Sequence, residues 1–385
     1  PMMPRVFQYL EKPSDLIRHF TPNWFTVCMG TGIVALIISE LPMFSDVFWN
    51  IGQTLWHINI FLFAACSVLY MARWALFYHE AKQVFQHPMM CLFLGAIPMA
   101  LATLINGMLK YGVPLYGEHL IDWAQQLWWL DVALAVTIAW IVPFCMYRHQ
   151  QHSLKNMTAV WLLPIVACEV AAASGGVLIA QLEAGQAAMQ ILLTSYVLWG
   201  MSVLPAFAVL TILMLRLALQ QLPAKEVGLS SWLTLGPIGT GALALLLLGH
   251  EAPRLMSFIG WGQLGELMQG AGILGSLILL GFAVWWLGIA LLSSVHHLQQ
   301  DLPFNLGWWA LTFPIGVLSL AVLTLAKTLG LAWMLSIGYS LTVLLILLWC
   351  IVAFKTVIGF YQGKLLFSPC LVQFLEKKSS VKSKT

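Results

Sequence analysis

The chain has 385 residues, of which 60% are hydrophobic and only 9% are charged. Because soluble domains carry about 25% charged residues, this composition excludes an ordinary soluble protein. The formal net charge is only +3, and we expect no nucleic-acid partner. The apolar residues form continuous runs of about 20, which is the length that crosses a lipid bilayer as an α-helix.

Ten such runs, taken in chain order, predict an all-α integral membrane protein with ten transmembrane helices. The expected spans are 23–41, 47–77, 89–109, 121–147, 158–182, 187–217, 230–249, 262–294, 304–328 and 333–360. We expect a cytoplasmic segment at 1–22, one ten-helix transmembrane domain at 23–360 and a cytoplasmic tail rich in Lys and Ser at 361–385. From about Ser368 onward the tail is expected to be solvated and partly disordered, near anionic lipid.

The basic residues of the loops lie almost entirely on one side of the predicted membrane. An even number of spans places both chain ends on that side, together with fifteen of the 18 Lys and Arg residues. Those fifteen are Arg5, Lys12, Arg18, Arg73, Lys82, Arg148, Lys155, Arg216, Lys225, Lys355, Lys364, Lys377, Lys378, Lys382 and Lys384. The opposite side takes Lys110, Arg254 and Lys327. Because cytoplasmic loops carry the excess of Lys and Arg, both termini are expected in the cytoplasm of a cell with this protein in its plasma or inner membrane.

The odd-numbered spans share prolines in register. Spans three, five, seven and nine each contain one proline several residues after their start. These prolines are Pro98, Pro164, Pro237 and Pro314. Span one fits loosely, with small residues at Gly30 and Gly32 but its proline at the helix start, Pro22. A helix proline is tolerated in a membrane mainly where protein or a water-filled cavity compensates for the lost hydrogen bond. The pattern predicts five inner helices around an axis and five outer helices behind them.

The even-numbered spans support this division but also supply an alternative. They are longer and rich in Leu and Trp, which suits helices that tilt and face lipid. They also contain Pro143 and Pro205. Since proline is common in membrane helices, its recurrence can also arise without any shared lumen.

Five motifs in the odd-numbered spans resemble the tellurite-resistance/dicarboxylate transporter family. They are residues 20–25 with 29–33, 87–88 with 95–99, 161–164 with 171–176, 236–239, and 312–314. The resemblance covers essentially all spans, and the first motif is most similar to the malate and C4-dicarboxylate branch. The family also includes bacterial tellurite-resistance proteins, sulfite exporters and plant slow anion channels.

The resemblance implies five helical hairpins in a quasi-five-fold arrangement around a central pore, often in a homotrimer with one pore per subunit. A phenylalanine of the ninth span occludes the pore in family members, and Phe313 is the matching position. An aromatic side chain across a narrow lumen blocks ions sterically and excludes water. A packed aromatic side chain beside Pro314 is the alternative interpretation of Phe313.

Glu169 lies near the middle of the fifth predicted span. A carboxylate at mid-bilayer is expensive and suggests a functional site, here one that binds and releases a proton during transport of an acid. That role suits a proton-coupled carrier and is awkward for a pure anion channel, because a charged glutamate repels anions. The alternative is a protonated glutamate bonded to a neighbouring helix.

No Lys or Arg lies deep inside a predicted span, so anion selectivity is expected to depend on polar groups and helix ends. The polar candidates on odd-numbered spans are Asn23, Thr31, Asn106 and Ser174. Thr31, between Gly30 and Gly32, is the strongest of them, although each could equally be a packing residue. Asp131 and His57, on even-numbered spans, are candidates for a structural polar pair, and Arg254 for a solvated loop charge.

The patterns expected of a membrane-embedded enzyme are missing from the sequence. It contains no H-x-x-x-H, no paired intramembrane carboxylates and no G-x-S-x-G. We therefore expect no enzyme activity, no cofactor and no metal. The leading hypothesis is transport of a small anion, a C4-dicarboxylate such as malate with a proton, through a pore closed by Phe313. The alternatives are a passive channel for small inorganic anions and an exporter of sulfite, tellurite or toxic compounds.

Overall fold

The computed structural model describes residues 6–382, and within them it contains helices and no strand. Arg5 and Lys384 of the predicted cytoplasmic charge set lie outside the described residues. Ten helical segments of the described chain are long and apolar enough to cross a membrane, which confirms the predicted number. They are Pro22–Glu40, Ser45–Leu76, Met90–Tyr116, His119–Arg148, Ala159–Ile179, Gln186–Gln220, Lys225–Phe258, Gly262–Leu298, Leu306–Leu329 and Ala332–Gln362.

Each odd-numbered span begins as a 3-10 helix and continues as an α-helix. The 3-10 segments are η1 (Pro22–Trp24), η4 (Met90–Gly95), η6 (Ala159–Leu162), η7 (Lys225–Thr234) and η8 (Leu306–Leu311). The α-helices that follow are α2 (Phe25–Ile37), α5 (Ala96–Gly107), α8 (Leu163–Ile179), α10 (Leu235–Phe258) and α12 (Phe313–Leu329).

The four prolines that recur in spans three, five, seven and nine lie where the 3-10 helix changes to an α-helix. Pro164 and Pro314 are the second residues of α8 and α12, and Pro98 and Pro237 are the third residues of α5 and α10. In the first turn of an α-helix the backbone N–H has no partner four residues back, so proline removes no helical hydrogen bond there. The prolines therefore set where each α-helix begins and are not breaks in the middle of a span.

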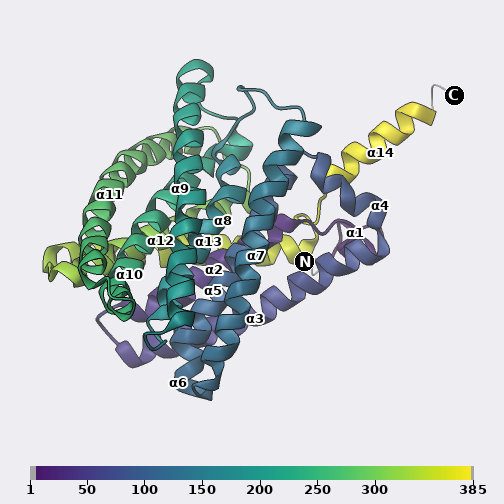
Figure 1. Ribbon diagram of the computed structural model, residues 1–385. Helices are drawn as coiled ribbons and strands as arrows, with labels where there is room; N and C mark the ends of the chain where they lie inside the picture. Colours follow the sequence, from purple (N-terminus) through teal and green to yellow (C-terminus); the bar gives the residue numbers. More distant parts are fainter. Residues whose placement is uncertain (1–5, 383–385) are drawn as a thin grey trace.

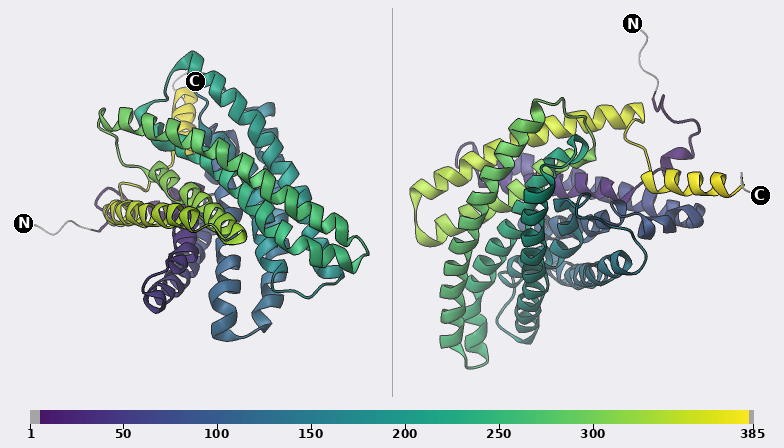
Figure 2. Two further views of the ribbon diagram at one scale, coloured as in Figure 1. Left: turned by 90° about the vertical axis from the view of Figure 1, so that its left-hand side faces the viewer. Right: turned by 90° about the horizontal axis from the view of Figure 1, so that it is seen from above.

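The even-numbered spans are continuous helices of 30 to 37 residues that form an outer layer. They are α3 (Ser45–Leu76), α7 (His119–Arg148), α9 (Gln186–Gln220), α11 (Gly262–Leu298) and α13 (Ala332–Gln362). Between 72% and 89% of the most apolar window of each odd-numbered span is buried, against 17% to 33% for the even-numbered spans. The two layers predicted from the sequence are therefore present, and Figures 1 and 2 show the long outer helices around the bundle.

The inner helices contact one another in an order that closes on itself. Helix α2 packs on α5, α5 on α8, α8 on α10, α10 on α12, and α12 on α2. Every outer helix packs on the inner helix of its own hairpin and on the next inner helix: α3 on α2 and α5, α7 on α5 and α8, and so on to α13 on α12 and α2. The quasi-five-fold symmetry of this arrangement stays a prediction.

One glycine stands at each of the five contacts between inner helices. A Cβ atom on any of these glycines would lie within 3 Å of an atom of the neighbouring helix. The five are Gly32, Gly95, Gly176, Gly239 and Gly316. Small residues let membrane helices approach closely, so this set fixes the tight spacing of the inner layer.

The start of the C-terminal tail differs from the expectation of a solvated segment. Ser368 is fully buried, and its hydroxyl accepts a hydrogen bond of 3.0 Å from Nη2 of the buried Arg73. Helix α14 (Pro369–Lys382) follows and packs against α4 (Tyr78–Ala81) and η3 (Lys82–Gln86), beside which Figure 1 shows it. The buried guanidinium needs acceptors, and the tail supplies one, which holds its first turn against the protein.

Candidate functional site

A cavity of about 310 Å³ lies at the N-terminal ends of the inner helices. All five inner spans contribute to its wall, for example through Met29, Met99, Val166, Pro237 and Phe313. The wall is mostly apolar, with η7 and η8 contributing many of its residues. The cavity therefore lies where the five inner helices begin.

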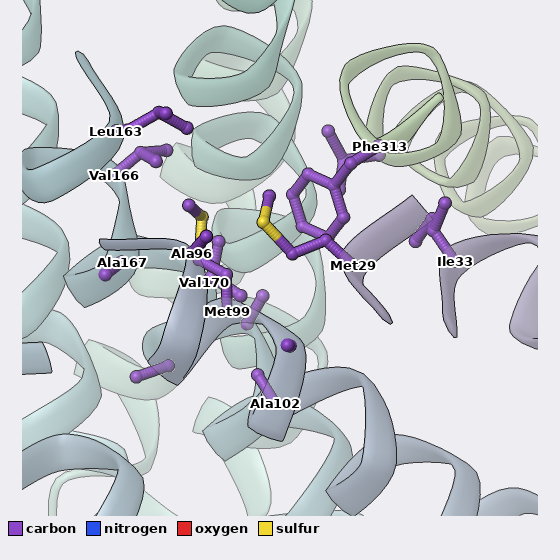
Figure 3. Close-up of a cluster of buried hydrophobic side chains, with 14 of the residues drawn as sticks. Met29, Ile33, Ala96, Met99, Ala102, Leu163, Val166, Ala167, Val170 and Phe313 are labelled. Carbon is purple, nitrogen blue, oxygen red and sulfur yellow. The ribbon is translucent and has the colours of Figure 1, made fainter. Parts of the chain in front are cut away.

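Phe313 is the first residue of α12 and is only 4% exposed. Figure 3 shows its ring with the side chains of Met29 from α2 and Val166 from α8 around the same space. Ala102 and Val170 belong to the same buried apolar cluster. Apolar side chains thus line the cavity at this level.

Side chains fix the starts of three inner spans by accepting backbone N–H groups. Asn305 accepts from the Gly307 N–H at 2.8 Å and Thr158 from the Val160 N–H at 3.3 Å. His87 Nδ1 accepts from the N–H groups of Met89 and Met90 at 3.2 and 2.9 Å. The same helix ends carry partial positive charge, so their convergence on the cavity favours an anion.

Charged side chains are scarce around the cavity. Lys225 is the basic member of its described wall and Glu226 the acidic one, and the two are adjacent in sequence. Asn305 Nδ2 donates to the Glu226 carbonyl oxygen at 2.9 Å, which fixes the wall near this pair. An anion in the cavity would therefore depend on helix ends, polar groups and one lysine.

Four of the candidate residues line the cavity: Asn23, Pro237, Phe313 and Pro314. The others lie outside its described lining, and they are Gly30, Thr31, Gly32, Pro98, Asn106, Pro164, Glu169 and Ser174.

The glycine-rich motif of the first span joins helices together. Thr31 Oγ1 accepts a hydrogen bond of 3.2 Å from Trp349 Nε1 of α13. A Cβ on Gly30 would collide with Thr312 and Trp309, and one on Gly32 with Thr103 and Asn59. The placement of Thr31 supports the packing interpretation, since its hydroxyl faces an outer helix.

Glu169 is fully buried between α8 and α10. Its Oε2 atom lies against Gly241, where a Cβ would be 3.4 Å away. Neither carboxyl oxygen has a hydrogen-bond partner within the described chain, and the same holds for Asn106 Oδ1 and Ser174 Oγ. A charged, unpaired carboxylate would be very costly in such a place, so the site suits a protonated side chain.

The expected pairing of Asp131 with His57 is not present. His57 Nε2 instead lies 2.7 Å from the Tyr116 hydroxyl, and its Nδ1 lies 2.8 Å from the Gln53 carbonyl oxygen. Asp131 is fully buried on α7, with both oxygens unpartnered in the described structure. Their helices α3 and α7 both pack on α5, which lies between them in the contact order.

Basic residues at the opposite end of the inner layer bind helix C-termini. Lys110 lies in the π-helical turn η5 (Met108–Gly112), which is part of the third span. The predicted span ended at residue 109 and placed Lys110 in a loop, which is wrong. Its Nζ atom donates to the Leu36 carbonyl at 2.6 Å. Arg254 donates to the carbonyls of Ile179 and Leu182 at 2.9 Å, so it is not a free loop charge. Cations are favourable at the negative ends of helices.

Comparisons with known proteins find relatives over most of the chain. The family described as voltage-dependent anion channel matches residues 19–357. A sulfite efflux pump of Arthroderma benhamiae is 35% identical over 343 residues, which cover 89% of this chain and 91% of that protein. An uncharacterized transporter of Methanocaldococcus jannaschii is 27% identical over 92% of this chain and 97% of its own length. A malic acid transport protein of Schizosaccharomyces pombe is 23% identical over 92% of this chain and 81% of its own length.

The family match begins before the first span and ends within the last, so it includes the whole inner layer. It confirms the family that the five motifs indicate, and with it the expectation of a transport protein and not an enzyme. The chain therefore belongs to the voltage-dependent anion channel family and is a multi-pass membrane protein that transports anions.

Proposed function

We propose that this protein moves a small oxyanion along the axis of the inner helices, from the cavity past Phe313. The observation that supports the proposal is a cavity that the starts of all five inner spans build and that buried apolar side chains, Phe313 among them, line. Helix N-termini attract the anion, and Lys225 is the one basic side chain of the described wall, so the anion is not held by a cluster of cations.

Sulfite is the substrate that we favour. The sulfite efflux pump of Arthroderma benhamiae shares more identity with this chain than the malic acid transport protein of Schizosaccharomyces pombe does. The mostly apolar wall, with Lys225 as its described basic residue, also suits an anion that can carry a single charge. Sulfite accepts a proton near neutral pH, whereas malate is doubly charged there and costs more to desolvate.

Malate moved with a proton is the second candidate. The buried, unpartnered carboxyl group of Glu169 favours it, because a side chain that is stable only when protonated could exchange its proton during each cycle. The malic acid transport protein among the relatives supports the same substrate class.

Flux into proteoliposomes containing the full chain tests the proposal. Sulfite, malate and chloride are each supplied with and without a proton gradient, at matched membrane voltage. We expect sulfite flux that saturates with concentration. Malate flux that requires the proton gradient would select the second candidate, voltage-driven chloride flux alone would indicate a passive channel, and no flux of any of the three would overturn the assignment.

We also propose how the protein is oriented in the membrane and how its subunits assemble. We place both termini in the cytoplasm, because most Lys and Arg residues of the loops lie on their side. The cavity then opens to the cytoplasm of a plasma or inner membrane, with residues 23–360 as the transporter domain. The family resemblance leads us to propose a homotrimer in which each subunit has its own pore.

A further inference from the structure

Three charged residues meet at the end of the inner layer that lies opposite the cavity. The Glu40 carboxylate is held between two lysines, with Oε1 at 2.7 Å from Lys110 Nζ and Oε2 at 2.5 Å from Lys327 Nζ. Lys110 also donates to the Leu36 carbonyl at 2.6 Å. Each oxygen of one carboxylate therefore binds a different ammonium group.

The position of this cluster follows from the helices that carry it. Glu40 ends η2 (Ile38–Glu40), which continues α2; Lys110 lies in η5, which continues α5; and Lys327 lies in the last turn of α12. Helix α2 contacts both α5 and α12, so the three elements are neighbours in the closed contact order. The opposite ends of these helices line the cavity, so the cluster lies at the end of the inner layer toward which an anion on the proposed path would move.

The charges of the cluster do not cancel. Two ammonium groups face one carboxylate, which leaves a formal charge of one positive unit. The Lys327 side chain is 51% exposed and Glu40 is 26% exposed, so a dissolved anion can reach both. Partly exposed ion pairs are weak and exchange readily with solvent ions.

We propose that Lys110 and Lys327 form an anion-binding subsite at this exit, and that Glu40 occupies it until a transported oxyanion displaces its carboxylate. The inference rests on the proposed pathway along the inner helices. Sulfite and carboxylate ions can replace the Glu40 side chain because they too have two oxygen atoms, and each oxygen can accept a hydrogen bond from one ammonium group. Glu40 thus competes with the substrate and keeps it from staying bound at the exit.

A purely structural clamp is the competing explanation. As a clamp, the cluster would join the ends of three inner helices, and removing either partner would loosen it. The variants Glu40→Gln and Lys327→Gln would then change transport in the same direction. A subsite with a built-in competitor predicts opposite directions.

The test uses proteoliposomes in which a C-terminal tag shows which way the protein is inserted. For each orientation, we measure the sulfite concentration that gives half-maximal flux. For sulfite applied on the face of Glu40, we expect Glu40→Gln to lower this concentration several-fold and Lys327→Gln to raise it several-fold. Sulfite applied on the cavity face should show neither change. The matched control is Lys364→Gln, because Lys364 follows the last span on the opposite face.

Same-direction changes, or equal changes on both faces, would overturn the subsite. Thermal unfolding in detergent checks that each variant is folded, and Lys327→Arg, which keeps the charge, should restore most of the wild-type value. Wild-type protein that carries no sulfite from either face would instead refute sulfite as the substrate of the proposed function. The two failures are therefore distinguishable.

Discussion

Phe313 is the residue on which the pathway depends most. Its ring lies at the cavity end of α12, nearly buried, among apolar side chains from other inner helices. Its position before Pro314 is fixed because the proline begins the α-helix at that point. On the proposed pathway, a bulky side chain at this level would be a steric barrier to an anion.

Phe313→Ala should raise the flux of the transported anion by about tenfold or more, since each 1.4 kcal/mol removed from a barrier accelerates passage about tenfold. Flux into proteoliposomes at equal protein content is the measurement. Phe61→Ala is the matched control, because Phe61 is 72% exposed on the outer helix α3. An unchanged flux in well-expressed Phe313→Ala would show that the ring is only a packing residue.

Glu169→Gln tests the buried carboxyl group. If Glu169 exchanges a proton during transport, the variant should lose the dependence of flux on the proton gradient while its fold is kept, because Gln is nearly isosteric and neutral. The control Glu183→Gln changes an exposed loop residue. Transport by Glu169→Gln that still follows the proton gradient would exclude this role.

We expect the stability of the protein to depend on pH through His87, which lies outside the described spans. Burial lowers the pKa of His87 from its usual value of about 6.5. The unfolded chain therefore binds a proton more readily, and the stability that the His87 cap contributes is present above about pH 6.5 and lost as the pH falls below it. His87→Asn keeps an acceptor for the Met89 and Met90 N–H groups but cannot titrate there.

We expect the unfolding temperature of the wild type to fall more than that of His87→Asn between about pH 7.5 and about pH 5.5. The exposed His79 supplies the control variant His79→Asn, which should behave as the wild type. Identical pH profiles for wild type and His87→Asn would contradict the assigned cap.

At the scale of elements, the inner helices depend on close glycine contacts. The Gly239 position of α10 lies against the backbone of Leu318 in α12, where a Cβ would be 2.9 Å from the Leu318 nitrogen. Backbone atoms cannot move aside as a flexible side chain can. The spacing between α10 and α12 is thus set by the absence of a side chain.

Gly239→Ala should destabilise the protein by roughly 1–3 kcal/mol, because overpacking forces the two helices apart. The control is Gly281→Ala on the outer helix α11, where no atom lies within 4 Å of the added Cβ. That control should be neutral or stabilising by roughly 0.5–1 kcal/mol, because Ala is a better helix former than Gly. Thermal unfolding in detergent measures both, and equal stability of the two variants would contradict the close contact.

Some elements were predictable and some side-chain directions were not. Ten spans follow directly from apolar runs, and the buried odd-numbered spans from the registered prolines and small residues. The direction of Thr31 did not follow, because α2 is apolar on all sides and has no polar face that fixes its rotation. The third span also extends beyond its predicted end because Lys110 continues it as a π-helix, with its charge satisfied by Leu36 and Glu40.

On the scale of the whole molecule, the layers position the cavity. Prolines and caps begin the inner helices at similar levels, glycines bring these helices together, and the outer helices cover them. Pro237, Pro314 and Phe313 could be placed at the cavity from sequence, but Lys225 could not, because nothing in the sequence shows how η7 packs. Glu169 could likewise be identified as buried, whereas the placement of its carboxyl group against Gly241 of α10 could not be foreseen from sequence.

Chemical modification of a cysteine in the cavity tests the central claim most directly. Gly236 lines the cavity, and its nearest foreign atom would lie 3.9 Å from an added Cβ, so Gly236→Cys has room for its side chain. A negatively charged thiol reagent applied to the cavity face should abolish anion flux through Gly236→Cys. Flux through Gly288→Cys should be unaffected by the same reagent, because that position lies on the outer helix α11 and outside the described cavity wall, and it too has room for the side chain. Undiminished flux through fully modified Gly236→Cys would show that the anion takes another route.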